Sequence, residues 1–145
     1  AGGCERSVDD AAVSLRTLPP WQPPRSADAL RGYLCGEWRL AKEMTYERGG
    51  LSGTFTGSAR FAPLEQGWLS YSECGQVTLC DDGQSFDATR RLRYDCGSGE
   101  IVQVYFDEPS VYFFHDINLS DAVPTFQHPC GPDMYNGMLI FEAPC

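Results

Sequence analysis

From residue 36 onward, the sequence is a succession of short runs in which apolar and polar residues alternate, separated by turn-forming residues. In the run that begins at Trp38, every second residue up to Tyr46 is large and apolar except Lys42, and the residues between them are polar or small. A period of two is the pattern of a β-strand with one buried face. Short connections between successive strands make neighbours antiparallel. This part of the chain is therefore expected to be an antiparallel all-β domain.

We predict eight strands, at residues 38–46, 55–61, 68–74, 76–80, 86–94, 101–106, 111–119 and 134–141. The stretch from residue 120 to 132 is predicted to be a loop. Eight antiparallel strands in sequence close most simply into an up-and-down barrel, because closure removes exposed sheet edges. A β-sandwich is the alternative. A barrel of this size is either filled by side chains or holds one small ligand.

Two segments precede the strands. Residues 1–25 are rich in Gly, Pro and polar residues and include Trp21 among four prolines, which predicts an extended arm. Trp21 is expected either to anchor in a groove of a partner or to fold back onto its own domain. Residues 26–34 are predicted to form a short helix capped by Ser26. A helix of two turns is unstable alone, so we expect it to cover one end of the barrel. The β-domain is thus assigned to residues 26–145.

Composition excludes several classes of partner. The chain has 20 acidic and 11 basic residues and a formal charge of −9. Nucleic acids and anionic membrane surfaces are bound mainly through Lys and Arg, so neither is expected as a partner. No apolar run approaches the ~20 residues that a membrane-spanning helix needs.

The chain has seven cysteines and no Cys-x-x-Cys pair, which argues against a zinc ribbon or finger. Reduced, mostly buried cysteines are one interpretation, and one or two disulfides in an oxidising compartment are the other. In the second case Cys74 and Cys80 would bridge a hairpin, and Cys4 or Cys145 would fix a terminus. The sequence names no compartment. We expect a soluble protein, in an organelle if a targeting segment has been removed.

The opening of the first strand, Gly36-x-Trp38 after a short helix, resembles the opening of the lipocalin (calycin) family. That resemblance implies that Trp38 packs across the closed end of a barrel. A closer resemblance is to a family of uncharacterised lipocalin-like domains, a domain of unknown function found in bacteria and some protists. It implies a fold and no activity. The matching positions, within residues 36–141, are Gly36-Glu37-Trp38-Arg39-Leu40, Gly57-x-Ala59-x-Phe61, Tyr71-x-Glu73-x-Gly75, Ala88-Thr89-Arg90-Arg91 with Tyr94, Phe114-His115-x-Ile117-x-Leu119, and His128-x-Cys130-x-x-Asp133-x-Tyr135-x-Gly137 with Phe141.

Strand alternation places several polar and aromatic side chains in the predicted interior. These are Lys42, Tyr71, Glu73, Arg90, Phe113 and His115. Buried charges need partners, because an unpaired buried charge is costly. In one interpretation Arg90 pairs with Glu73 and the barrel is simply filled. In the other, basic interior residues converge on a polar or anionic ligand.

A second cluster of reactive side chains, His128, Cys130, Asp133 and Tyr135, lies near the C-terminus. A metal site would need three or four such groups to converge, and no such arrangement is evident in the spacing. A Cys130–His dyad lacks an identifiable orienting group. We therefore interpret the cluster as a structural lock between loop and strand, and we expect no metal or haem, although His115 or His128 could ligate a haem.

Three functions are compatible with these patterns. The first is a non-catalytic binding module that holds a small apolar or acidic ligand in the barrel. The second is an accessory subunit of a larger assembly, docked through the N-terminal arm. The third is an enzyme that uses His128, Cys130 and Asp133. We expect the first.

Overall fold

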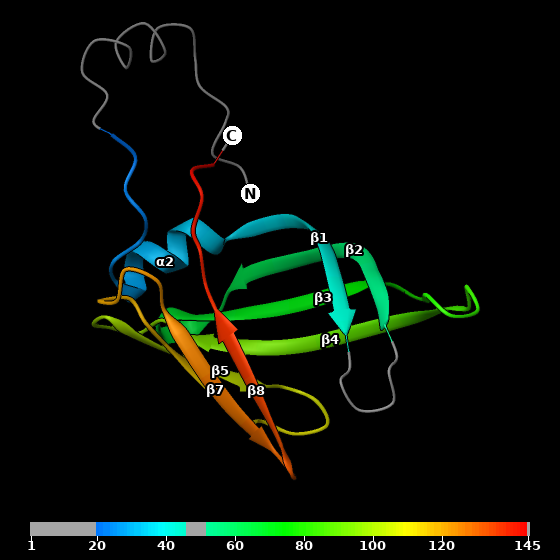
Figure 1. Ribbon diagram of the computed structural model, residues 1–145. Helices are drawn as coiled ribbons and strands as arrows, with labels where there is room; N and C mark the ends of the chain where they lie inside the picture. Colours follow the sequence, from blue (N-terminus) through cyan, green and yellow to red (C-terminus); the bar gives the residue numbers. More distant parts are fainter. Residues whose placement is uncertain (1–19, 46–51, 145) are drawn as a thin grey trace, which may run out of the picture.

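The structure, a computed structural model, describes residues 20–45 and 52–144 (Figure 1). Most of the predicted arm, the turn after the first strand, Cys4 and Cys145 lie outside these residues. The described elements are the helix α2 (Ala27–Leu34), the 3-10 turn η1 (Glu65–Gly67) and the strands β1 (Gly36–Thr45), β2 (Ser52–Pro63), β3 (Trp68–Leu79), β4 (Ser85–Asp95), β5 (Ile101–Phe106), β6 (Tyr112–Asn118), β7 (Thr125–Cys130) and β8 (Asp133–Met138).

The strands form two antiparallel sheets. One has six strands in the order β1-β2-β3-β4-β5-β6, and the other is the hairpin β7-β8, which lies beside β6. The prediction of an all-β domain with one short helix is therefore confirmed. The strands that the structure describes do not close into a barrel, because β1 and β8 are not paired with each other. The meander order expected of an up-and-down barrel is nevertheless kept from β1 to β6.

Two strand boundaries predicted from the sequence are wrong. Gly75 does not end a strand, because it lies in the middle of β3 opposite Gly57. The stretch predicted to be a loop, residues 120–132, contains β7. This strand includes Pro129, and proline argues against a strand unless the strand has a free edge. The continuous β3 also excludes a Cys74–Cys80 bridge. Six residues of extended chain span ~20 Å, far beyond the reach of a disulfide.

The backbones of β2 and β3 approach each other closely at Gly57 and Gly75. A Cβ atom on Gly57 would lie 2.2 Å from the carbonyl oxygen of Cys74, and one on Gly75 would lie 2.2 Å from that of Thr56. Only glycine allows the two backbones to approach this closely.

The core lies between α2 and the face of the sheet that carries Trp38 in β1, here called the inner face. The side chains of Ala27 and Leu30 on α2 are fully buried against inner-face residues of the six-stranded sheet. Ser26 caps the helix as predicted, since its hydroxyl accepts a hydrogen bond from the Ala29 N–H at 3.1 Å. Figure 1 shows α2 across one end of the sheet, which leaves the other end uncovered by helix.

Trp38 joins β1 to that helix. Its indole N–H donates to the Leu34 carbonyl at 2.7 Å, and its ring packs against the ring of Tyr33 at 5.6 Å. Gly36, between helix and strand, has φ = +121°, a conformation that residues with side chains rarely adopt. The Gly36-x-Trp38 sequence is therefore required by the turn from α2 into β1. No helix among the described residues is long and apolar enough to cross a membrane.

Candidate functional site

Four of the six predicted interior residues meet on the inner face of the six-stranded sheet. Glu73 in β3 lies opposite Arg90 in β4, and Tyr71 precedes Glu73 by two residues on the same face. Lys42 reaches them from β1 across β2. Directly opposed residues of antiparallel strands share a face, so strand pairing alone puts these side chains together.

Glu73 is the buried charge of this group, with a 7% exposed fraction. The Lys42 ammonium donates to its Oε2 at 2.6 Å, and the Tyr71 hydroxyl donates to its Oε1 at 2.8 Å. The same ammonium lies 4.7 Å above the centre of the Phe55 ring. The carboxylate thus has one cation and one neutral donor, which together offset the cost of its burial.

Two tyrosines adjoin the carboxylate. Burial, and then the hydrogen bond to Glu73, raise the pKa of Tyr71 well above its usual range. Burial likewise raises the pKa of Tyr94. Their rings pack with Phe61, whose centre lies 4.8 Å from that of Tyr71 and 5.2 Å from that of Tyr94. Both tyrosines are therefore neutral at neutral pH, and Tyr71 donates a hydrogen bond to Glu73.

Arg90 differs from Lys42. It stands opposite Glu73. Among the described residues, however, Glu73 forms its ion pair with Lys42, and Arg90 forms none. Its side chain is exposed, as is that of Phe86 on the same face of β4. The predicted Arg90–Glu73 pair is therefore replaced by Lys42–Glu73, and the guanidinium remains exposed on the inner face.

Phe113 is not on the inner face. A register shift between Val104 and Tyr105 breaks the alternation along β6, so that Phe113 pairs with Tyr105. The two rings are 5.7 Å apart, and Phe113 is 47% exposed. Tyr105 in turn packs against Trp68 on the outer face, at 5.5 Å. The prediction that Phe113 shares a face with His115 is therefore wrong. The bulge separates them, and an alternating pattern does not predict a bulge.

His115 remains inside and holds the hairpin. It is 6% exposed, its ring stacks on that of Phe126 in β7 with centroids 3.6 Å apart, and its Nδ1 lies 3.1 Å from the Asp116 carbonyl oxygen. Burial lowers the pKa of His115. Phe126 was not singled out from the sequence. The sequence feature that could have indicated it is Gly137, which lies opposite Phe126 in β8 and leaves room for the ring.

The C-terminal cluster forms the hairpin itself. His128 in β7 lies opposite Tyr135 in β8, and Cys130 lies opposite Asp133. The Nδ1–H of His128 donates to the Phe114 carbonyl at 2.9 Å, which attaches the hairpin to β6. Within residues 20–45 and 52–144, no group of three or more His, Cys, Asp or Glu residues is arranged to hold a metal ion.

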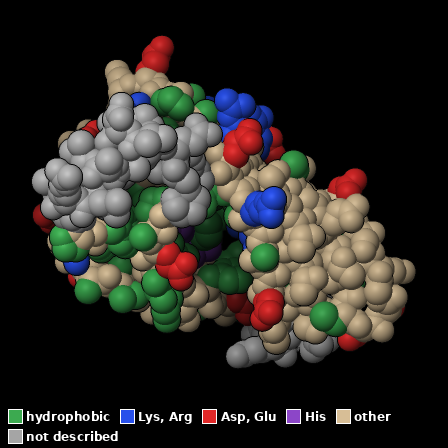
Figure 2. Space-filling view, turned by 90° about the horizontal axis from the view of Figure 1, so that it is seen from above, with side chains coloured by type: hydrophobic (Ala, Val, Ile, Leu, Met, Phe, Trp, Pro, Cys, Tyr) green, Lys and Arg blue, Asp and Glu red, His purple; other side chains and the backbone are tan. Residues whose placement is uncertain are grey.

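The inner face is partly exposed, at Phe86 and Arg90 of β4. Figure 2 shows a hollow whose walls carry hydrophobic side chains, with a histidine visible inside it. The two histidines of the chain belong to β6 and β7. The histidine visible in the hollow therefore comes from one of these two strands.

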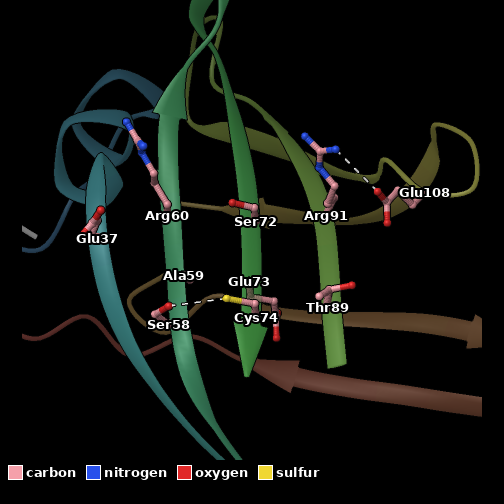
Figure 3. Close-up of a pocket in the computed structure, with 10 residues that line it drawn as sticks. All are labelled: Glu37, Ser58, Ala59, Arg60, Ser72, Glu73, Cys74, Thr89, Arg91 and Glu108. Carbon is pink, nitrogen blue, oxygen red and sulfur yellow. Dashed lines mark hydrogen bonds and ion pairs between the residues drawn. The ribbon is translucent and has the colours of Figure 1, made fainter. Parts of the chain in front are cut away.

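A shallow groove on the outer face was missed by sequence reasoning. Its cavity volume is about 480 Å³, and Figure 3 shows polar side chains from neighbouring strands along it. Arg91 at one side pairs with Glu108 at 3.7 Å, and the pair is more than half exposed. Most of these residues are outer-face polar positions of the alternating runs, and Ala59 and Glu73, whose side chains belong to the inner face, also border the groove. The lining residues are Glu37, Ser58, Ala59, Arg60, Ser72, Glu73, Cys74, Thr89, Arg91 and Glu108.

Trp21 lies against its own domain. Its ring centre is 6.4 Å from that of Tyr33, which also packs edge-on against Phe141 at 5.5 Å. The Tyr33 hydroxyl donates to the Glu142 carbonyl at 2.9 Å. These contacts join the arm, the helix and the C-terminal segment. Trp21 is still 42% exposed, and its role toward a partner remains a prediction.

Comparison with protein families gives one match. The model of a family of unknown function, DUF6314, matches residues 34–144, which is more than half of the chain. The chain belongs to this family. The DUF6314 region begins at the end of α2 and contains every strand described above. No curated protein and no solved structure matches the chain significantly.

Proposed function

We propose that this DUF6314 domain is a non-catalytic, lipocalin-like binding module that holds an amphipathic acid on its inner face. The observation that supports the proposal best is the exposed guanidinium of Arg90 beside a carboxylate already neutralised by Lys42. The chemical class of the ligand follows from what surrounds that guanidinium.

The charge of the inner face favours an anionic ligand. Glu73 is the buried acid of this face, and its two oxygens already accept hydrogen bonds from Lys42 and Tyr71. The guanidinium of Arg90 presents parallel N–H donors that match a carboxylate in geometry and charge. An incoming carboxylate would complete the charge balance of the four-residue group.

The residues near Arg90 favour a ligand that carries an apolar part next to its anionic end. Phe86 is on the same face of β4 and is 51% exposed, and it lies opposite Val77 in β3. Val77 in turn lies opposite Phe55 in β2. This row of apolar side chains crosses the inner face four residues along β4 from Arg90, and Phe86 is its exposed member, as suits the apolar part of a ligand with one charged end.

The lipocalin-like interpretation draws support from three features. The six strands follow one another as in an up-and-down barrel, a short helix covers one end, and Trp38 packs at that end against the helix. In such folds the inner face is the binding face. The hairpin would form the remaining wall.

Titration with dodecanoate, followed by calorimetry, tests this function. We expect dodecanoate to bind and the uncharged dodecanol to bind more weakly. Arg90→Met should weaken dodecanoate binding about tenfold or more, since a charge-assisted hydrogen bond is lost. Arg91→Met, which removes the same charge from the outer face one residue later, should leave binding unchanged. Equal losses in both variants, or no binding to the wild type, would contradict the proposal.

A further inference from the structure

Among the described strands, β1 is paired along only one of its two edges. That edge pairs with β2 at ten consecutive positions, from Gly36 opposite Phe61 to Thr45 opposite Ser52. No strand within the part of the chain that the structure describes pairs with the other edge. A row of unpaired backbone N–H and C=O groups of this length is a template for a strand from another chain.

A second copy of β1 can pair with this edge only in certain registers. If two copies form one continuous sheet, related by a two-fold axis perpendicular to it, inner-face residues must lie opposite inner-face residues. The axis must then pass midway between one residue of β1 and the same residue of the other copy, and the register is named here by that residue. The central candidates are Arg39, Leu40, Ala41 and Lys42.

Charge distinguishes these four registers. An axis at Arg39 or at Lys42 places that cation opposite itself. An axis at Leu40 places Glu37 of each copy opposite Glu43 of the other. Like charges directly opposite each other destabilise a strand pair.

The axis at Ala41 has the opposite effect. It places Arg39 of each copy opposite Glu43 of the other, so the same ion pair forms twice. On the inner face, Trp38 then lies opposite Met44, and Leu40 lies opposite the aliphatic stem of Lys42. The ammonium of Lys42 does not obstruct the edge, because it is bonded to Glu73 on the inner face.

We propose that two copies of this chain associate through their β1 edges, antiparallel and centred on Ala41, so that one sheet continues across both. The partner is thus a second copy of the chain, and the recognition lies in the spacing of Arg39 and Glu43. The inference does not depend on the ligand of the inner face.

Sedimentation equilibrium of the full chain tests it. We expect a concentration-dependent dimer. Glu43→Arg should raise the dimer dissociation constant about tenfold or more, because it places two like-charged pairs across the interface. Arg39→Glu should do the same with the opposite charge. The double variant Arg39→Glu/Glu43→Arg should return the constant to within about threefold of the wild type, since opposite charges again face each other.

The matched control is Glu37→Arg, the same charge change on the same face of the same strand. In the proposed register Glu37 lies opposite Thr45, so this variant should not weaken the dimer. Circular dichroism establishes that each variant is folded. A wild type that stays monomeric at every concentration overturns the proposal. So does a dimer that is insensitive to the charge reversals, or one that the double variant fails to restore.

Discussion

Glu73 and its two donors show how a charge can be placed inside a small β-domain. The carboxylate is buried, and both of its oxygens accept a hydrogen bond, one from an ammonium and one from a phenol. Removing one partner of such a pair costs more than removing both, because an uncompensated charge is left behind. This asymmetry allows the pair to be tested without knowledge of the ligand.

We expect Lys42→Met to lower the free energy of unfolding by about 1–3 kcal/mol. The loss is smaller than for a fully buried pair, because the Lys42 side chain is 36% exposed. The double variant Lys42→Met/Glu73→Met should recover most of it. Urea denaturation measures each value. A Lys42→Met variant as stable as the wild type would show that Lys42 does not support the carboxylate.

At the scale of single elements, alternation predicts which face a residue occupies only where a strand is regular. It placed Lys42, Tyr71, Glu73 and Arg90 correctly on one face of the sheet. It failed for Phe113, because the bulge next to Tyr105 reverses the order of faces. Neither glycine nor proline occurs in β5 or β6, so no residue of these strands indicates the bulge.

The choice of ion-pair partner also lay beyond the sequence. Arg90 is adjacent to Glu73 across one strand pair, whereas Lys42 is two strands away. The long Lys42 side chain crosses over the Phe55 ring to reach the carboxylate. A contact of this kind depends on the twist and curvature of the sheet, which alternation along a strand does not report.

The hairpin β7-β8 is attached to the sheet by a histidine whose charged form is disfavoured by burial. Burial lowers the pKa of His115 below its ordinary 6.5, so the unfolded chain binds the proton more readily than the folded one. Stability that depends on this residue is then present above pH 6.5 and is lost as the pH falls. Asp116 on the same strand and His128 on the hairpin are the titratable groups that act on it.

We therefore expect the free energy of unfolding to fall between pH 7.5 and pH 5.5, by at most about 1.4 kcal/mol per pH unit from this group. His115→Phe keeps an aromatic ring against Phe126 and removes the titration, so its stability should depend less on pH. Urea midpoints at the two pH values measure the difference. Equal pH dependence in wild type and variant would mean that His115 does not couple protonation to folding.

For the whole molecule, the open arrangement of the described strands is the main departure from expectation. Eight antiparallel strands are present, yet they form a six-stranded sheet and a separate hairpin. The hairpin meets β6 through side chains, chiefly the stacked pair His115 and Phe126. Sequence patterns report the faces of strands but not the neighbours of an edge strand, so closure could not be derived from them.

The most direct measurement is a ¹H–¹⁵N spectrum of the arginine side-chain Nε–H groups during titration with dodecanoate. Variants that replace single arginines by lysine assign the signals. If the inner face binds the acid, the Arg90 signal shifts as ligand is added and the signals of Arg60 and Arg91, on the outer face, do not. A shift confined to Arg60 and Arg91, with Arg90 unchanged, would place binding in the outer groove and contradict the proposed function.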